Sequence, residues 1–82
     1  MEKTEKFLLK LSRKNRQFLK HAILKRIIAL DLDGMDIKPL KGHKGFYRAR
    51  HKKIRVLFYK DLANGVGVLV EVNYRDKIYK NL

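Results

Sequence analysis

The sequence has no cysteine, no tryptophan, a single proline and only 8 acidic residues. The absence of cysteine excludes disulfide bridges and thiolate metal sites, and it is typical of proteins of a reducing compartment. The apolar runs are too short to cross a membrane, and no signal-peptide core is present. We therefore expect a cytoplasmic protein without a membrane partner.

Side chains that carry common enzyme chemistry are also scarce. Ser12 is the single serine and Thr4 the single threonine, so no serine nucleophile stands out. His21, His43 and His51 lie far apart and lack the short spacings of a zinc site. We interpret each histidine as a surface residue, although His51 lies within a basic segment and could move protons near neutral pH.

The acidic residues do not form a metal site either. Asp31, Asp33 and Asp36 surround Gly34, but Asp36 stands where a calcium-binding loop requires glycine. We interpret them as loop residues that favour turns. The glycines fit neither dinucleotide-binding nor P-loop spacing. We therefore expect no metal and no small-molecule cofactor.

Positive charge dominates the composition, because 21 Lys and Arg residues leave a net charge of +13. This charge is concentrated in residues 1–30 and 45–60, whereas the rest of the chain is balanced. Solubility of a small domain requires a net charge of only about 2–8. The excess therefore predicts a polyanion or an acidic protein as partner.

The first third of the chain is predicted to be helical. Phe7, Leu8 and Leu11 have helical spacing, and Ser12 is a plausible N-cap for a second helix. From residue 16 to about 30 an apolar stripe recurs at three- and four-residue intervals. Its members are Phe18, Leu19, Ala22, Ile23, Ile27 and Leu30. Two helices packed as a hairpin are the simplest interpretation, and one bent helix is the alternative.

Beyond Gly42 the pattern changes to a period of two, which is typical of strands. Strands are predicted near 45–50, 54–60 and 66–72, with a short last strand around 77–80. Asn64-Gly65 indicates a hairpin turn. The valines at 66, 68, 70 and 72 alternate, and we expect them to pack under the helices. The prediction is a single α+β domain over 1–82, with helices (4–30), a loop (31–44) and an antiparallel sheet (45–80).

The basic hairpin at 45–60 is the strongest candidate for a working surface. In a strand, Arg48 and Arg50 share one face while Tyr47 and Ala49 share the other, and Arg55 follows in the next strand. Guanidinium groups on an exposed sheet face supply paired donors suited to phosphate. Tyrosines can stack on unpaired bases, so single-stranded RNA is favoured over duplex DNA. The expected RNA-binding residues are Lys41, Lys44, His51, Lys52, Lys53 and Tyr74.

Four segments in this order resemble the RelE/ParE superfamily of bacterial and archaeal toxins. They are KPLKG at 38–42, FYRAR at 46–50, IRVLFY at 54–59 and RDKIY at 75–79. The resemblance covers nearly the whole chain and implies a small antiparallel sheet packed on a helical hairpin. It also implies the toxin of a type II toxin–antitoxin system, bound by a cognate acidic antitoxin.

The ribonuclease branch of this superfamily cleaves messenger RNA on the ribosome, where the 2′-hydroxyl of the RNA attacks the adjacent phosphate. That reaction needs neither a metal nor a protein nucleophile. The resemblance implies that the catalytic residues are Arg48, Arg50, Arg55, Arg75 and Tyr79. The terminal tyrosine favours this branch over the ParE branch, whose members inhibit DNA gyrase. A gyrase inhibitor and a plain RNA- or ribosome-binding module remain the alternatives.

Two features depart from the superfamily pattern. Arg48 and Arg50 stand where well-known ribonuclease members carry lysines, and arginine is a poor proton donor. The general acid would then be His51, Lys52 or Lys53, or the proton would come from water. Members also usually begin with a strand, for which residues 1–4 are too short and polar. An antitoxin strand could cover a sheet edge left open in this way.

Overall fold

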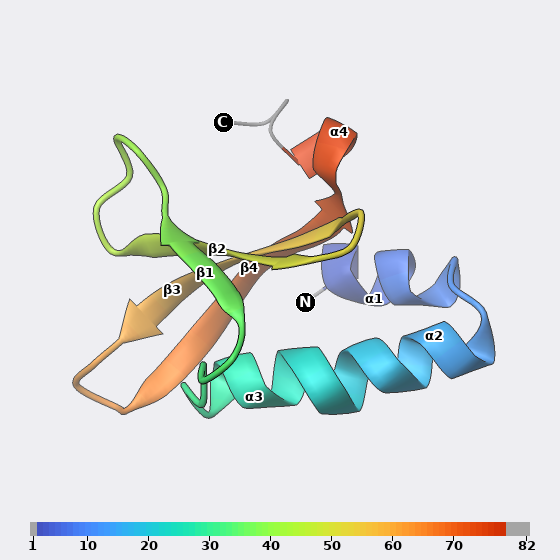
Figure 1. Cartoon of the computed structure of the whole chain (residues 1–82), viewed down its shortest axis with the longest axis horizontal. Helices are drawn as coiled ribbons and strands as arrows, with labels where there is room; N and C mark the ends of the chain where they lie inside the picture. Colours follow the sequence, from blue (N-terminus) through green and yellow to red (C-terminus); the bar gives the residue numbers. More distant parts are fainter. Residues whose placement is uncertain (1, 79–82) are drawn as a thin grey trace.

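The computed structural model describes residues 2–78 and contains a helical hairpin on one face of a four-stranded sheet, with a short last helix on the other face (Figure 1). The helical elements are α1 (Glu2–Leu9), α2 (Arg13–Phe18), the π-helix η1 (Leu19–Leu24), α3 (Lys25–Ile28) and α4 (Arg75–Ile78). The strands are β1 (Asp36–Pro39), β2 (Phe46–His51), β3 (Ile54–Asp61) and β4 (Val66–Tyr74). The predicted α+β class is confirmed.

The helices form the predicted hairpin. Ser12 caps α2, because its hydroxyl accepts a hydrogen bond from the N–H of Asn15 at 3.3 Å. The elements α2, η1 and α3 run on as one rod, which returns antiparallel to α1 (Figure 1). None of these helices is long and apolar enough to cross a membrane.

The π-helical segment shifts which side chains of this rod meet the sheet. Leu19, Ile23 and Ile27 are buried as predicted, and Leu24 joins them. Phe18 is predicted to belong to the same stripe, but it is 51% exposed. A π-helix places more residues in each turn than an α-helix, so an apolar stripe cannot keep its phase through it.

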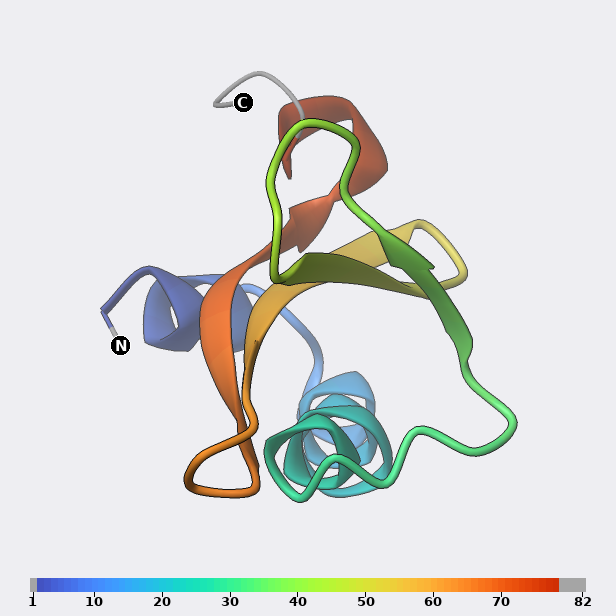
Figure 2. The same cartoon turned by 90° about the vertical axis from the view of Figure 1, so that its left-hand side faces the viewer.

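The sheet is antiparallel throughout, with the strand order β1-β2-β3-β4. It is strongly twisted and curls around the helical rod (Figure 2). The predicted strands at 45–50, 54–60 and 66–72 are confirmed as β2, β3 and β4. The prediction of a loop over 31–44 was wrong at residues 36–39, which form β1 on the edge of the sheet. Four residues with only Ile37 half-buried are too short to give a recognisable period of two.

The predicted last strand around 77–80 was wrong in the part that the structure describes, since residues 75–78 form α4. The N–H of Arg75 donates to the carbonyl of Lys53 at 2.9 Å, directly after β4 ends. The chain then turns onto the face of the sheet opposite α1–α3 (Figures 1 and 2). Ile78 is fully buried there although it lies outside the main core cluster.

A β-bulge overturns the expectation that four valines share the helix-facing side of β4. Leu57 pairs with Glu71 but Phe58 pairs with Leu69, so Val70 is an extra residue. One extra residue exchanges the two faces of a strand, because side chains alternate with a period of two. Only Val72 is therefore buried, whereas Val68 and Val70 are each 44% exposed.

The β3–β4 connection shows the predicted turn at Asn64-Gly65. Gly65 has a φ of +66°, and Asn64 donates two hydrogen bonds to the carboxylate of Asp61, from its backbone N–H and from its side chain. These bonds, with the side-chain bond the larger cause, hold the pKa of Asp61 below its usual value.

The core lies between the helices and the inner face of the sheet. Phe58 and Val56 of β3 and Ala49 of β2 cluster with Leu19 and Ile27 of the rod. Gly67 permits the close approach of β4 to α3, because a Cβ at this position would lie 2.2 Å from the carbonyl oxygen of Ile27. The opposite face of the sheet carries Arg48, Arg50 and Arg55 together with the buried apolar side chain of Leu57.

Candidate functional site: an arginine face

Three of the predicted catalytic residues lie on one face of the sheet, which we call the arginine face (Arg48, Arg50 and Arg55). Arg48 and Arg50 lie two residues apart on β2 and therefore point to the same side. Arg50 pairs directly with Arg55 of β3. Directly opposed residues share a face, with Cβ atoms about 4.5–5.5 Å apart. The intervening Ala49 points into the core, where it is 1% exposed. The predicted alternation along β2 is confirmed.

Arg48 and Arg55 are unusually buried for arginines, with residue exposures of 9% and 8%. Buried charges must be paired or hydrogen-bonded. Arg55 meets this requirement at the β2–β3 turn, where its Nη1 donates to the carbonyls of Lys52 at 2.8 Å and Ile54 at 3.1 Å. Its guanidinium is therefore held in one position beside Arg50.

Asp36 is the partner of the other two arginines, and the sequence interpretation did not include it in the site. One carboxylate oxygen lies 3.2 Å from Nε of Arg50, and the other lies 3.8 Å from Nη2 of Arg48. Asp36 faces Arg50 because β1 pairs with β2 in that register. The one signal in the sequence was the alternation of Asp36, Ile37 and Lys38, which is too short to separate a strand from a loop.

Arg75 lies at the first position of α4, beyond the end of the hairpin. Its backbone is tied to Lys53, so it is anchored to the same turn that holds the guanidinium of Arg55. A cavity of about 340 Å³ beside Arg75 is lined by Lys53, Tyr74, Arg75, Asp76 and Lys77. The predicted catalytic residue Tyr79 lies outside the described residues.

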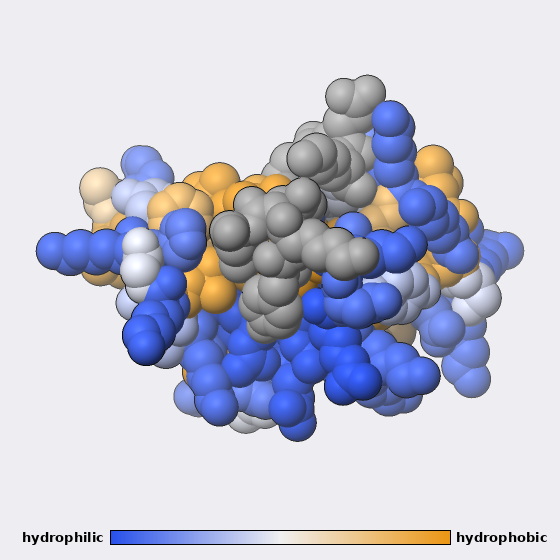
Figure 3. Space-filling model, turned by 90° about the horizontal axis from the view of Figure 1, so that it is seen from above, coloured by the Kyte–Doolittle hydropathy of each residue, from blue (hydrophilic) through white to orange (hydrophobic). Residues whose placement is uncertain are grey.

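The predicted RNA-binding residues divide between three places. Lys41 and Lys44 are exposed in the β1–β2 connection, and Lys52 and Lys53 form the two-residue β2–β3 turn. Seen from the side of α4, hydrophilic residues gather along one side of the molecule (Figure 3). No group of three His, Asp or Glu side chains that could hold a metal ion occurs within residues 2–78.

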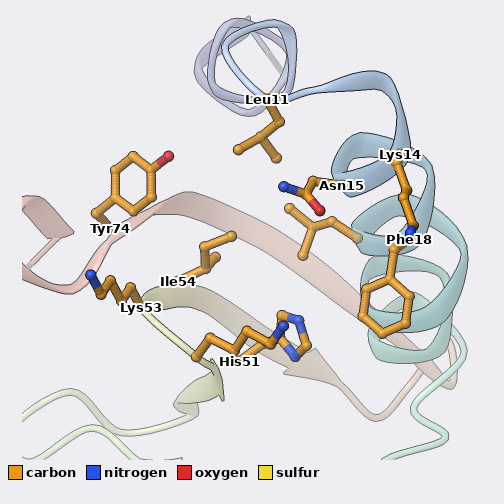
Figure 4. Close-up of a pocket in the computed structure, with 10 residues that line it drawn as sticks. Leu11, Lys14, Asn15, Phe18, His51, Lys53, Ile54 and Tyr74 are labelled. Carbon is orange, nitrogen blue, oxygen red and sulfur yellow. The ribbon is translucent and has the colours of Figure 1, made fainter.

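His51 and Tyr74 lie on the opposite side of the hairpin, in what we call the helix-side cavity. It has a volume of about 510 Å³ and is lined by Leu11, Lys14, Asn15, Phe18, Leu19, His51, Lys52, Lys53, Ile54 and Tyr74 (Figure 4). The rings of His51 and Phe18 lie 5.1 Å apart. Burial lowers the pKa of His51 below its usual 6.5, and the charge of Lys52 lowers it further. The structure therefore does not bring His51 to the arginine face.

The whole fold is similar to a chain of the RelB–RelE antitoxin–toxin complex from Methanococcus jannaschii. The TM-score is 0.72 at 20% sequence identity, and the similarity covers 100% of this chain and 95% of that chain. The chain has a RelE-like fold. The sequence matches no protein-family model and no curated protein. At this identity, the similarity establishes the arrangement of helices and strands.

The RelE-like fold explains how a short chain assembles an arginine face. The helical hairpin fills one side of the sheet with apolar side chains, so the alternate residues of β2 and β3 must point to the other side. In this chain those residues include Arg48, Arg50 and Arg55, with one carboxylate from β1 beside two of them, and the apolar or aromatic side chains of Phe46, Leu57 and Tyr59. Such an arrangement can bind phosphate and stabilise negative charge.

Proposed function

We propose that this protein is the toxin of a type II toxin–antitoxin system and that it cleaves messenger RNA on the ribosome. The observation that carries the proposal is the arginine face, in which Arg48, Arg50 and Arg55 are held together on a RelE-like fold. Arg50, whose side chain is 57% exposed, would contact the scissile phosphate, while the buried Arg48 and Arg55 add fixed positive charge beside it.

The chemistry uses the RNA as its own nucleophile. The 2′-hydroxyl oxygen forms a bond to the adjacent phosphorus, and the bond from phosphorus to the 5′-oxygen of the next nucleotide breaks. The products are a 2′,3′-cyclic phosphate and a free 5′-hydroxyl. Negative charge grows on the phosphoryl oxygens in the transition state, where the guanidinium groups stabilise it. We assign the removal of the 2′-hydroxyl proton to Tyr79.

The leaving 5′-oxygen takes its proton from a lysine of the β2–β3 turn or from water. Arg48 and Arg50 are unsuited to this step because arginine stays protonated. His51 points to the helix side, and its lowered pKa leaves less of the protonated form at neutral pH. Lys52 and Lys53 lie at the edge of the arginine face, next to Arg55.

The partner that we propose is a cognate acidic antitoxin. The net charge of +13 favours binding to an acidic protein or a polyanion. Within residues 2–78, β4 is an edge strand, and Val68 and Val70 are exposed on it. An antitoxin strand added beside β4 would cover these residues and pair the free backbone groups.

Induced expression followed by mapping of messenger RNA ends tests the enzymatic proposal. The wild-type protein should arrest growth and produce new ends within translated codons. Arg50→Ala and Tyr79→Phe should each lower cleavage at least about 100-fold, the usual range for removing a charge-stabilising or proton-transferring group. Lys20→Ala, on the exposed side of η1, is the control and should cleave normally.

Growth arrest with unchanged messenger RNA would contradict the ribonuclease proposal. If gyrase were inhibited in the same cells, the gyrase-inhibitor alternative would replace it. Unimpaired growth together with salt-dependent RNA binding would leave a plain RNA-binding module.

A further inference from the structure

The helix-side cavity has the size of a ligand site and lies apart from the arginine face. Its volume of about 510 Å³ falls within the range of about 300–1,000 Å³ that is common for small-molecule sites. It opens between α2 and the end of the β2–β3 hairpin (Figure 4). His51 and Ile54 line it, whereas their neighbours Arg50 and Arg55 point to the opposite face of the sheet.

Aromatic rings form part of its wall: Phe18 lies outside the core, and Tyr74 packs against the edge of the core. Phe18 is 51% exposed and lies 5.1 Å from the ring of His51. Tyr74 is fixed edge-on by Phe7 at 5.1 Å, and its hydroxyl points toward the cavity (Figure 4). Flat rings that remain exposed beside a cavity offer stacking surfaces for a planar ligand.

Beside the apolar side chains of Leu11, Leu19 and Ile54, the cavity has polar groups that suit a nucleotide. Lys14, Lys52 and Lys53 line it, and no acidic residue does. The side-chain amide of Asn15 points into the same space (Figure 4) and makes no hydrogen bond within the described part of the chain. An amide both donates and accepts, which matches the edge of a nucleobase, while ammonium groups attract phosphate.

We propose that the helix-side cavity binds one nucleotide, with its base stacked on Phe18 and its phosphate held by the lysines of the β2–β3 turn. The amide of Asn15 would contact the edge of the base. An acidic peptide would also satisfy the lysines, but it lacks the flat base that stacks on an exposed ring. The nucleotide is either a free one or an unpaired residue of RNA.

If the bound nucleotide belongs to an RNA, a single strand would contact both faces of the β2–β3 hairpin. Lys52 and Lys53 lie at the tip, between Arg50 and Arg55 on one face and His51 and Ile54 on the other. A single strand that passes over this tip would place one base in the cavity and a neighbouring phosphate at the arginine face. This arm of the proposal rests on the proposed function, whereas binding of a free nucleotide does not.

Nuclear magnetic resonance titration of the purified protein tests the proposal without ribosomes or cleavage. The probes are adenosine and uridine monophosphates and a short single-stranded RNA with 2′-O-methyl groups, which cannot be cleaved. Binding in the cavity should shift the resonances of the Asn15 amide and of the Phe18 and His51 rings. Phe18→Ala should weaken binding about tenfold, as expected for loss of one base–aromatic contact. Leu62→Ala, which is 78% exposed in the β3–β4 connection, is the control and should bind normally.

Saturation by a monophosphate identifies a free nucleotide as the source, and binding by the oligonucleotide alone identifies RNA; either result supports the proposal. Shifts confined to the arginine face would overturn it. Equal competition by tripolyphosphate or by a polyglutamate peptide would also overturn it, because charge alone would then explain binding. If messenger RNA is not cleaved in cells but these shifts occur, the ribonuclease proposal fails and the nucleotide site remains.

Discussion

The two faces of the sheet are built on opposite physical principles. The helix-covered face buries aliphatic and aromatic side chains such as Phe58 and Val56, which have no exposed surface. The arginine face also buries side chains, but two of them are charged and depend on specific partners. Loss of an apolar contact on the first face costs stability, whereas loss of a partner on the second changes the charge offered to a ligand.

This difference matters because the β2–β3 hairpin belongs to both faces. Ala49 packs into the core while Arg48 and Arg50, on either side of it, point outward. Core packing therefore fixes the positions of the arginines without using their charge. Substitutions that separate stability from binding can test whether the two faces are independent.

Phe58→Ala should give the largest effect, because this side chain is fully buried at the centre of the core. We expect the free energy of unfolding to fall by about 3–5 kcal/mol. Urea denaturation followed by circular dichroism measures this change. Val68→Ala, on the exposed side of β4, is the control and should cost less than about 1 kcal/mol. Similar costs at both positions would mean that the bulge does not separate the faces.

Gly67→Ala tests the close approach of β4 to α3. The added methyl would meet the carbonyl of Ile27, so strand and helix must move apart, at a cost of about 1–3 kcal/mol. Gly34→Ala is a useful contrast, because a Cβ at this position has no atom within 4 Å. Its destabilisation of about 1 kcal/mol comes instead from the φ of +75°. Urea denaturation of both variants gives the comparison. A neutral Gly67→Ala would show that the layers are not in contact there.

Asp36→Asn moves the comparison to the arginine face. Removing the carboxylate leaves buried Arg48 without its charged partner, and we expect a loss of about 1 kcal/mol that shrinks at high salt. RNA binding should strengthen at the same time, since a competing negative charge has gone. Asp33→Asn makes the same charge change at an exposed loop position. Filter binding and urea denaturation of both variants separate the local effect from net charge.

The smallest effect should be the pH dependence that His51 contributes. Its pKa is lowered in the folded protein, so the unfolded chain binds more protons below its usual value of 6.5. As far as His51 is concerned, the folded protein therefore has its full stability above pH 6.5, and the free energy of unfolding decreases as the pH falls below that value. His51→Gln should therefore reduce the difference in unfolding free energy between pH 7.5 and pH 5.5, and His43→Gln is the control. An unchanged difference in His51→Gln would contradict the partly buried position of this ring.

Much of the fold follows from patterns that are local in the sequence. The Ser12 cap, the buried positions Leu19, Ile23 and Ile27, and the three long strands were predicted because each depends on neighbours a few residues away. The arginine face was predicted for the same reason, since the alternation along β2 is a local property. Its function and its catalytic roles stay predictions, and Tyr79 lies outside the described residues.

Other features depend on contacts that no local pattern carries. The bulge at Val70 reverses the faces of β4, and the π-helix takes Phe18 out of the core and places it beside the helix-side cavity. Asp36 joined the site only because β1 pairs with β2, while α4 replaced the expected last strand. Each of these outcomes depends on register between distant segments, where one residue of shift changes which side chain faces which partner.

The sequence by itself therefore determined the class of the fold, the concentration of positive charge and the outward direction of Arg48 and Arg50. Periodicity is sufficient for these, because the hydrophobic effect buries whichever face is apolar. Only the tertiary structure decided that a carboxylate from β1 lies beside two of the arginines, and that His51 faces away from them toward Phe18. The physical reason is that these contacts join separate strands and helices, whose pairing depends on the packing of the whole chain.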